Sequence, residues 1–347
     1  MSSKKIIQVD EKVPGKLLVP LSLQHTFAMF GASVLVPIIF GIDPSIVLLM
    51  NGISTLLFIL ITKGKAPAYL GSSFAFIGPT SIIIANQGFA YAQGAFVVLG
   101  IIGCLLALFI RRVGTGWINI VLPPAAMGAV VALIGLELAS STVQGGSIGA
   151  NLMTDTASSS DFIVFFITLG VAILGSVLFK GFLSTIPILI SIVVGYLSAV
   201  AFGMVDFTPV LETSLFTMPH FQWAKFDLNA ILTMLPVLLV LTSEHIGHQV
   251  VTSNVIGRDL MKDPGLHRSL FADYFASALS GLIGGVPTTT YGENIGVMAI
   301  TRVYSVRVIA GAAIFSICMA FVGPLAALIS TIPGNVIGGV TFLLYGM

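Results

Sequence analysis

Three ionisable side chains stand in apolar stretches of the sequence, where charge is costly. Glu244 and His248 follow the uncharged run 230–241, and Glu293 lies in a similar setting further along the chain. Ionisable groups at membrane depth usually face a protein interior or a water-filled cavity and mark a pathway. The carboxyl groups could accept hydrogen bonds from a ligand or carry protons, and His248 shares a helical face with Glu244 four residues earlier. The pattern predicts a site at mid-membrane where Glu244 and Glu293 meet.

The composition is that of an α-helical polytopic membrane protein. Of the 347 residues, 56% are hydrophobic and only 8% are charged, whereas a soluble domain has about 25% charged residues. The apolar runs are continuous and approach the roughly 20 residues that a helix needs to cross a bilayer. They do not alternate as the strands of a membrane barrel would. The net charge of +1 indicates no nucleic-acid partner.

The apolar runs predict about twelve membrane spans, and the basic residues predict their orientation. With a cytoplasmic tail at residues 1–16, all but Lys225 of the 15 Lys and Arg residues fall on the inner side, as the positive-inside rule requires. The predicted spans are 17–40, 46–62, 68–87, 91–110, 117–138, 161–179, 184–202, 229–249, 268–285, 288–302, 304–330 and 332–347.

The third and tenth spans are short and rich in Gly, Ser and Thr. In each, a β-prone stretch (68–74 and 287–292) leads into a helix-like run. A strand that enters a half-helix leaves backbone groups unpaired at membrane depth, which is tolerated only where they line a cavity. Two such breaks point to a binding site, with the half-helix N-termini supplying N–H donors. The alternative is that the glycines only allow helices to pack closely.

Short matches along the chain indicate an inverted repeat. They occur in the same order at nearly one offset, so that spans 1, 3 and 5 pair with spans 8, 10 and 12. A unit of seven spans places its second copy upside down, which is typical of transporters with a site at the repeat interface. On this pattern spans 13 and 14 are absent from the sequence. The matching pairs are 21–25 with 241–245, 69–73 with 291–294, and 123–130 with 333–340.

The other polar residues of the spans give narrower expectations. Gln24 and His25 occupy the repeat position of Glu244 and His245, so they are expected in the same polar network. His245 points about 100° away from Glu244 on a helix and is expected to contact a neighbouring helix. Asp273, close to Arg268, is expected at the membrane interface.

No motif for metal, nucleotide or nucleophilic chemistry is present. The order Glu-His-x-x-His differs from the zinc-binding His-Glu-x-x-His, so no metal site and no enzyme are predicted. A channel would need polar residues along a continuous pore, whereas the buried polar residues here cluster at one depth and favour a carrier.

Two motifs resemble those of the nucleobase–ascorbate transporters (nucleobase:cation symporter-2). One is Gln24-His25, and the other runs from Glu293-Asn294-Ile295-Gly296 to Thr301-Arg302. Within that family, residues 67–76, 243–248 and 290–301 are similar to the bacterial uracil permeases. The likeness extends over residues 17–347.

The resemblance implies a fold of 14 spans in two inverted sevens, of which about 12 are present. A core domain would comprise spans 1–4 (17–112) and 8–11 (229–330). A gate domain would comprise spans 5–7 (113–228) and span 12 (331–347). The implied activity is import of uracil with protons across a bacterial cytoplasmic membrane, through elevator-like movement of core against gate. A homodimer and no cofactor besides the coupling proton are implied. A purine, xanthine or ascorbate carrier of the same family is the alternative.

The resemblance also implies roles for individual residues. Glu244 and Glu293 would accept hydrogen bonds from the ring nitrogens of uracil, and the backbone N–H groups of Phe74 and Gly292 would hold its carbonyl oxygens. Phe74 would stack near the ring and Tyr291 would flank it. Glu244, Glu293 and His248 would couple transport to protonation. The residues expected to support these contacts without touching uracil are Gln24, His25, Ser73, His245 and Asn294.

Overall fold

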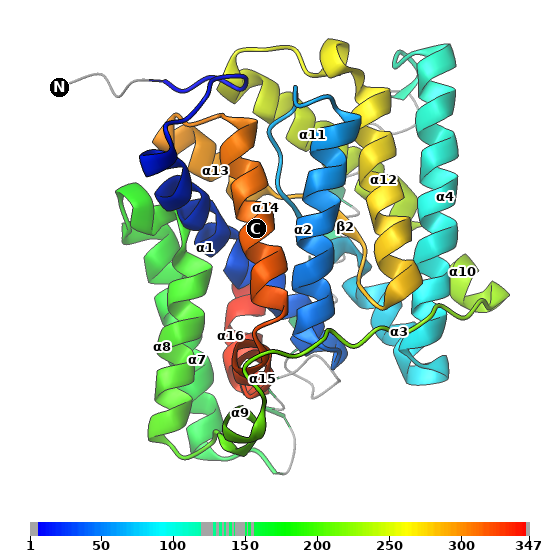
Figure 1. The fold of residues 1–347 in the computed structure, drawn as a ribbon. Coiled ribbons are helices and arrows are strands. Elements are labelled where there is room, and N and C mark those ends of the chain that lie inside the picture. The colour runs from blue at the N-terminus through cyan, green and yellow to red at the C-terminus, as the bar shows by residue number, and fades with distance from the viewer. Residues whose placement is uncertain are drawn as a thin grey trace.

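A bundle of long apolar helices encloses one short pair of strands (Figure 1). The computed structural model describes residues 6–118 and 156–344, together with scattered positions between 128 and 153. Helices α7 and α8 lie on one side of the bundle, α4 and α12 on the other, and α2 and α14 between them. The bounds are α1 Gly15–Phe40, α2 Pro44–Ile61, β1 Leu70–Ser72, η1 Phe74–Phe76, α3 Ile77–Gln87, α4 Phe89–Val113, α7 Ser159–Leu178, η2 Gly181–Thr185, α8 Pro187–Ala201, α9 Thr208–Glu212, α10 Leu228–Met234, α11 Val237–Ile256, η3 Met261–Gly265, α12 Leu266–Ile283, β2 Thr288–Thr290, α13 Gly292–Thr301, α14 Val306–Ala320, α15 Gly323–Ser330 and α16 Gly334–Leu344.

Several helices have the length and composition of membrane spans. Within the described residues, five helices are long and apolar enough to cross a bilayer, or six if the bent pair α15 and α16 forms one span. The chain is therefore a mostly helical multi-pass protein. The full set of twelve spans, their inverted repeat and the core and gate boundaries stay predictions. The predicted span 117–138 and the repeat match at 123–130 lie largely outside the described residues.

The prediction of a single helix over 304–330 is wrong. Helix α14 ends at Ala320, and α15 starts at Gly323 with Pro324 in its first turn. A loop residue, Phe216, pairs antiparallel with Val322 at the break. The Leu215 carbonyl accepts the Gly323 N–H at 3.1 Å. Because the loop satisfies these backbone groups, the chain can leave the helix, and α15 then bends by 81° from α16.

The two short spans each contain a strand followed by a helix, as the sequence predicts. Strands β1 and β2 pair antiparallel, with Leu70 opposite Thr290 and Ser72 opposite Thr288. Strand β1 leads through η1 into α3, and β2 leads directly into α13. All six strand residues are buried. The pairing therefore brings the starts of two half-helices together inside the bundle.

Hydroxyl side chains from neighbouring helices complete the hydrogen bonding of this strand pair. The Thr55 hydroxyl of α2 accepts the Leu70 N–H at 2.9 Å. On the other strand, the Ser277 hydroxyl of α12 accepts the Thr288 N–H at 3.1 Å and donates to the Thr288 carbonyl at 2.7 Å. Without these partners, the outer edges of a two-stranded sheet would present unpaired polar groups to an apolar interior.

The described part of the predicted tail, residues 6–13, packs against the bundle. Ile7 forms a parallel bridge with Val303, just after α13. Val9 is buried in a core cluster, and the Asp10 carboxylate lies 2.8 Å from the Arg258 guanidinium. The segment therefore ties the loop after α13 to the loop after α11. The sequence misses this contact because backbone pairing leaves no pattern in side-chain polarity.

Candidate functional site

The two carboxyl groups predicted to meet come from adjacent helices. Glu244 lies in the middle of α11, and Glu293 lies in the first turn of α13. The two helices pack together, and Glu244 is within electrostatic range of Glu293 and of Asp273. Among the described residues no side chain or backbone group hydrogen-bonds to the Glu244 carboxyl group. The acceptance of hydrogen bonds from a ligand by Glu244 stays a prediction.

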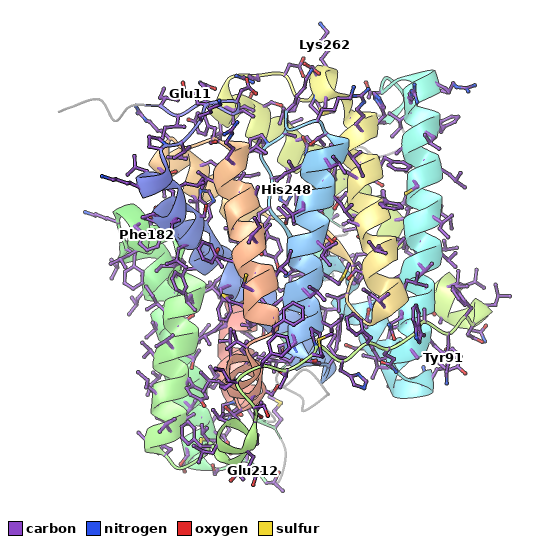
Figure 2. The ribbon with its side chains drawn as sticks, viewed as in Figure 1. Glu11, Tyr91, Phe182, Glu212, His248 and Lys262 are labelled. Atoms are coloured by element: carbon purple, nitrogen blue, oxygen red, sulfur yellow. The ribbon has the colours of Figure 1, made fainter. Side chains whose placement is uncertain are left out.

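His248 follows Glu244 by four residues on α11 and lies between the two ends of the bundle (Figure 2). Its Nδ1 is 3.0 Å from the Thr290 hydroxyl of β2. An added Cβ at Gly292 would lie 3.5 Å from its Nε2. The ring therefore covers the junction of β2 and α13. A proton exchange between His248 and Glu244 stays a prediction, because the hydrogen bond that orients His248 comes from Thr290.

The starts of both half-helices offer backbone N–H donors. Neither Tyr291 before α13 nor Ser73 before η1 caps the following helix with its side chain. The first N–H groups of a helix have no partner within the helix. Gly292 is exposed and Phe74 is half-buried. The starts of η1 and α13 are therefore uncapped by side chains. The use of their N–H groups together with Glu244 and Glu293 to bind a ligand stays a prediction.

Tyr291 holds the strand pair together. Its side chain is 4% exposed, its hydroxyl donates to the Ser72 carbonyl at 3.2 Å, and its ring lies against Gly71. A Cβ on Gly71 would overlap this ring. Gly71 is therefore required by a close approach. The predicted contact between Tyr291 and a bound ring remains untested.

Gly71→Ala is expected to push Tyr291 off β1 and to destabilise the protein by about 1–3 kcal/mol, the usual cost of overpacking. The measurement is the midpoint of thermal unfolding in detergent. Gly170→Ala in α7 is the matched control, because an added Cβ there meets nothing within 4 Å. The same loss of stability in both variants would contradict the close contact between Gly71 and the Tyr291 ring.

A second polar contact connects α1 to α13. Nδ1 of His25 lies 3.2 Å from the Asn294 side-chain oxygen, and the Asn294 amide donates to the Pro67 carbonyl at 3.4 Å. His25 is 1% exposed. The structure thus brings His25 and Asn294 together, while half-buried Gln24 makes no hydrogen bond within the described residues. Ser73 contributes its backbone N–H, which donates to the Pro287 carbonyl at 3.0 Å.

The expectation that Asp273 lies at the membrane interface is wrong. Its side chain is fully buried, and its carboxylate lies 2.8 Å from Nδ1 of His245, which is also fully buried. The Thr289 hydroxyl donates to the same carboxylate oxygen at 3.1 Å. Asp273 therefore joins α11, α12 and β2, the strand that leads into α13. His245 makes the inter-helix contact that the sequence predicts.

The hydrogen bonds around His245 indicate a charged pair. The Ser269 hydroxyl donates to the Leu266 carbonyl, so its oxygen accepts from Nε2 of His245 at 3.0 Å. Nδ1 faces the Asp273 carboxylate. Both ring nitrogens thus face acceptors, an arrangement that suits the doubly protonated ring. The sequence signal was the spacing of Ser269, Asp273, Ser277 and Ser280, which puts four polar side chains on one stripe of α12.

Comparison with known proteins decides the family. A family model described as "Permease family" matches residues 16–347. The chain belongs to this permease family. A uracil permease of Paenibacillus larvae is 52% identical over 345 residues, covering 99% of this chain and 82% of the relative. A uracil permease of Escherichia coli is 52% identical over 346 residues, covering 99% and 80%.

A solved structure shows the same fold at low sequence identity. The transmembrane domain of the cyanobacterial bicarbonate transporter BicA has a TM-score of 0.72, with 15% identity, covering 98% of this chain and 91% of that domain. This permease therefore has a membrane transporter fold. The likeness says nothing of its substrate.

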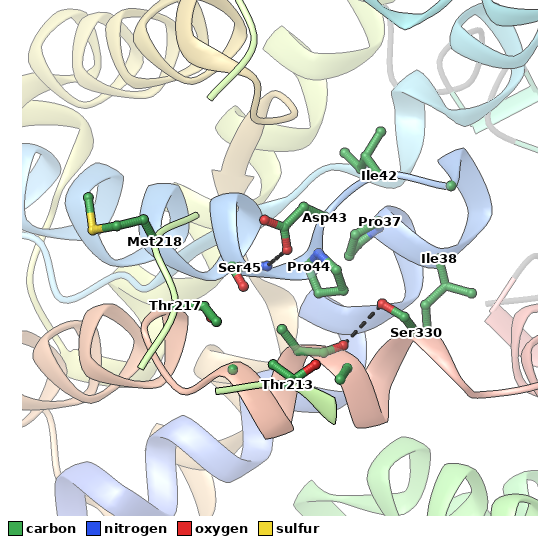
Figure 3. Close-up of a pocket in the computed structure, with 14 residues that line it drawn as sticks. Pro37, Ile38, Ile42, Asp43, Pro44, Ser45, Thr213, Thr217, Met218 and Ser330 are labelled. Atoms are coloured by element: carbon green, nitrogen blue, oxygen red, sulfur yellow. Dashed lines mark hydrogen bonds between the residues drawn. The ribbon is translucent and has the colours of Figure 1, made fainter. Parts of the chain in front are cut away.

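One cavity of this permease lies away from the candidate site. A cavity of about 480 Å³ lies between the α1–α2 turn, residues 213–218 and α15 (Figure 3). It contains none of the predicted site residues. No group of three or more His, Cys, Asp or Glu side chains within the described residues could hold a metal ion.

Proposed function

We propose that the chain is a secondary active transporter that imports uracil by proton symport across the cytoplasmic membrane of a bacterium. The observation that carries the proposal is the position of Glu244 and Glu293 beside the open starts of α13 and η1. Uracil has two ring N–H donors and two carbonyl acceptors, which match two carboxyl groups and two backbone donors. Such matching rejects analogues that lack a partner group. The names of the relatives support uracil as the substrate.

In this proposal each residue keeps the role expected from the sequence. Glu244 and Glu293 accept from the ring nitrogens, the backbone N–H groups of Phe74 and Gly292 hold the carbonyl oxygens, and Phe74 stacks near the ring. His248 exchanges a proton with Glu244. The His245–Asp273 pair fixes α11 against α12, so the position of Glu244 depends on it.

The transport cycle follows from the division into core and gate. The core would carry uracil and move against the gate in an elevator-like manner, within a homodimer. Strands β1 and β2 lie in the proposed core. Helices α2 and α12, whose hydroxyl groups hydrogen-bond to these strands, also lie in it, which favours their movement as one body. The N-terminus lies on the cytoplasmic side, as the distribution of basic residues indicates.

Uptake of labelled uracil into proteoliposomes tests the proposal. The full-length protein is expected to accumulate uracil only under an inward proton gradient, and unlabelled uracil should compete far better than xanthine. The control is the same preparation with the gradient collapsed by an ionophore. Better competition by xanthine would assign a purine carrier of the family, and uptake that ignores the gradient would contradict proton coupling.

A further inference from the structure

An extended segment crosses the outside of the bundle at the end opposite the N-terminal segment. This crossing segment, residues 213–227, runs from α9 to α10 past the ends of α15, α2, α12 and α4 (Figure 1). Figure 2 shows Tyr91 and Glu212 at this end and Glu11 and Lys262 at the other. The segment therefore lies at the level where the membrane helices end.

The backbone of the crossing segment is turned toward the helix ends. The N–H groups of Gln222 and Ala224 donate to the last carbonyls of α12, at Ile283 and Leu282, at 3.2 and 3.3 Å. The Lys225 N–H donates to the Ala90 carbonyl of α4 at 2.8 Å. The last carbonyls of a helix have no partner within the helix. The segment supplies partners for the end of α12, and the N–H groups of Gln222, Ala224 and Lys225 are thereby satisfied without water.

Asp43 fixes a further point of the segment. One carboxylate oxygen accepts the His220 N–H at 2.8 Å, and the other caps α2 through the Ser45 N–H at 2.8 Å (Figure 3). The segment is thus held against α4 and α12 by main-chain hydrogen bonds, and against the start of α2 by the Asp43 carboxylate. The N–H groups of Thr217, His220, Gln222, Ala224 and Lys225 are thus paired within the protein. This pairing lowers the cost of placing the segment against lipid.

Six large apolar side chains of the segment are exposed, among the exposed polar residues Ser214, His220, Gln222 and Lys225. The six are from 45% to 79% exposed, and Trp223 is 70% exposed. Monomeric soluble proteins seldom expose so many large apolar side chains close together. The side chains are Leu215, Phe216, Met218, Phe221, Trp223 and Phe226.

We propose that the crossing segment is a membrane-interface anchor, whose aromatic side chains insert between lipid headgroups and the first acyl carbons. Trp and other aromatic residues favour this depth because they combine an apolar body with a polar edge. The adjoining helices also expose apolar side chains, such as Leu282 of α12 and Ile101 of α4. The anchor is independent of which substrate the permease carries.

The two tryptophans of the chain allow a direct test. Trp117→Phe leaves Trp223 as the sole tryptophan, and Trp117 is outside the proposed site. The variant is reconstituted into liposomes that contain lipids brominated either near the headgroup or near the chain ends. Shallow bromines are expected to quench Trp223 about twofold or more better than deep bromines, with little quenching by iodide. Trp223→Phe is the matched control, because its fluorescence comes from Trp117 alone and shows how a tryptophan outside the segment is quenched.

Three other results would contradict the proposal that the crossing segment lies at the membrane interface. Strong quenching by iodide without quenching by brominated lipid would place the segment in water. Stronger quenching by deep bromines would place it in the acyl core. Loss of lipid quenching as the protein-to-lipid ratio rises would show that a second copy covers the segment. If Trp117→Phe does not fold, Trp117→Tyr gives the same readout.

Discussion

Asp273→Asn is expected to abolish uptake and to destabilise the protein by about 3–5 kcal/mol, the range measured when one partner of a buried ion pair is removed. The Asp273 carboxylate accepts hydrogen bonds from His245 and Thr289, and both side chains of the pair are fully buried. An amide of the same size leaves the His245 charge without its counter-ion. The measurements are the midpoint of thermal unfolding in detergent and uptake of labelled uracil.

A double-mutant cycle separates this pair from the general cost of a buried substitution. His245→Ala removes the charge that Asp273→Asn leaves unpaired, so the double variant should be more stable than the sum of the two single effects predicts. Asp206→Asn, at an exposed loop position, is the matched control and should leave stability unchanged. Strictly additive effects of Asp273→Asn and His245→Ala would contradict a direct interaction.

Glu244→Gln and Glu293→Gln are each expected to weaken uracil binding about 10- to 100-fold, because a hydrogen bond to a charged group contributes about 1.5–3 kcal/mol. Both should also lose gradient-driven accumulation, since glutamine cannot carry a proton. Equilibrium binding and proteoliposome uptake measure the two effects. Glu212→Gln, on the exposed helix α9, is the matched control. Full activity of either site variant would remove that residue from the site.

The parts of the fold that a local pattern marks could be predicted from the sequence. The strand-to-helix breaks at β1–α3 and β2–α13 are marked by Gly, Ser and Thr in otherwise apolar surroundings, and the structure confirms them. The position of Glu293 at the start of α13 follows from the second of these breaks. These features depend on short-range backbone preferences, which neighbouring residues reveal.

The parts that depend on distant partners could not be predicted. The burial of Asp273 depends on His245 and Thr289, which lie on other elements. The break between α14 and α15 depends on the pairing of Phe216 with Val322, and the docking of residues 6–13 depends on a bridge to Val303. An aspartate near a helix start is more often exposed, so local reasoning favours the wrong position.

Equilibrium binding of methylated uracils to the purified protein tests most directly whether two carboxyl groups recognise the two ring N–H groups. Uracil, 1-methyluracil and 3-methyluracil are compared, with 5-methyluracil as the control for added size. Because a site built to hydrogen-bond a ligand group rejects analogues that lack it, each N-methyl compound should bind at least about 100-fold more weakly than 5-methyluracil. Binding of either N-methyl compound as tightly as 5-methyluracil would contradict the account.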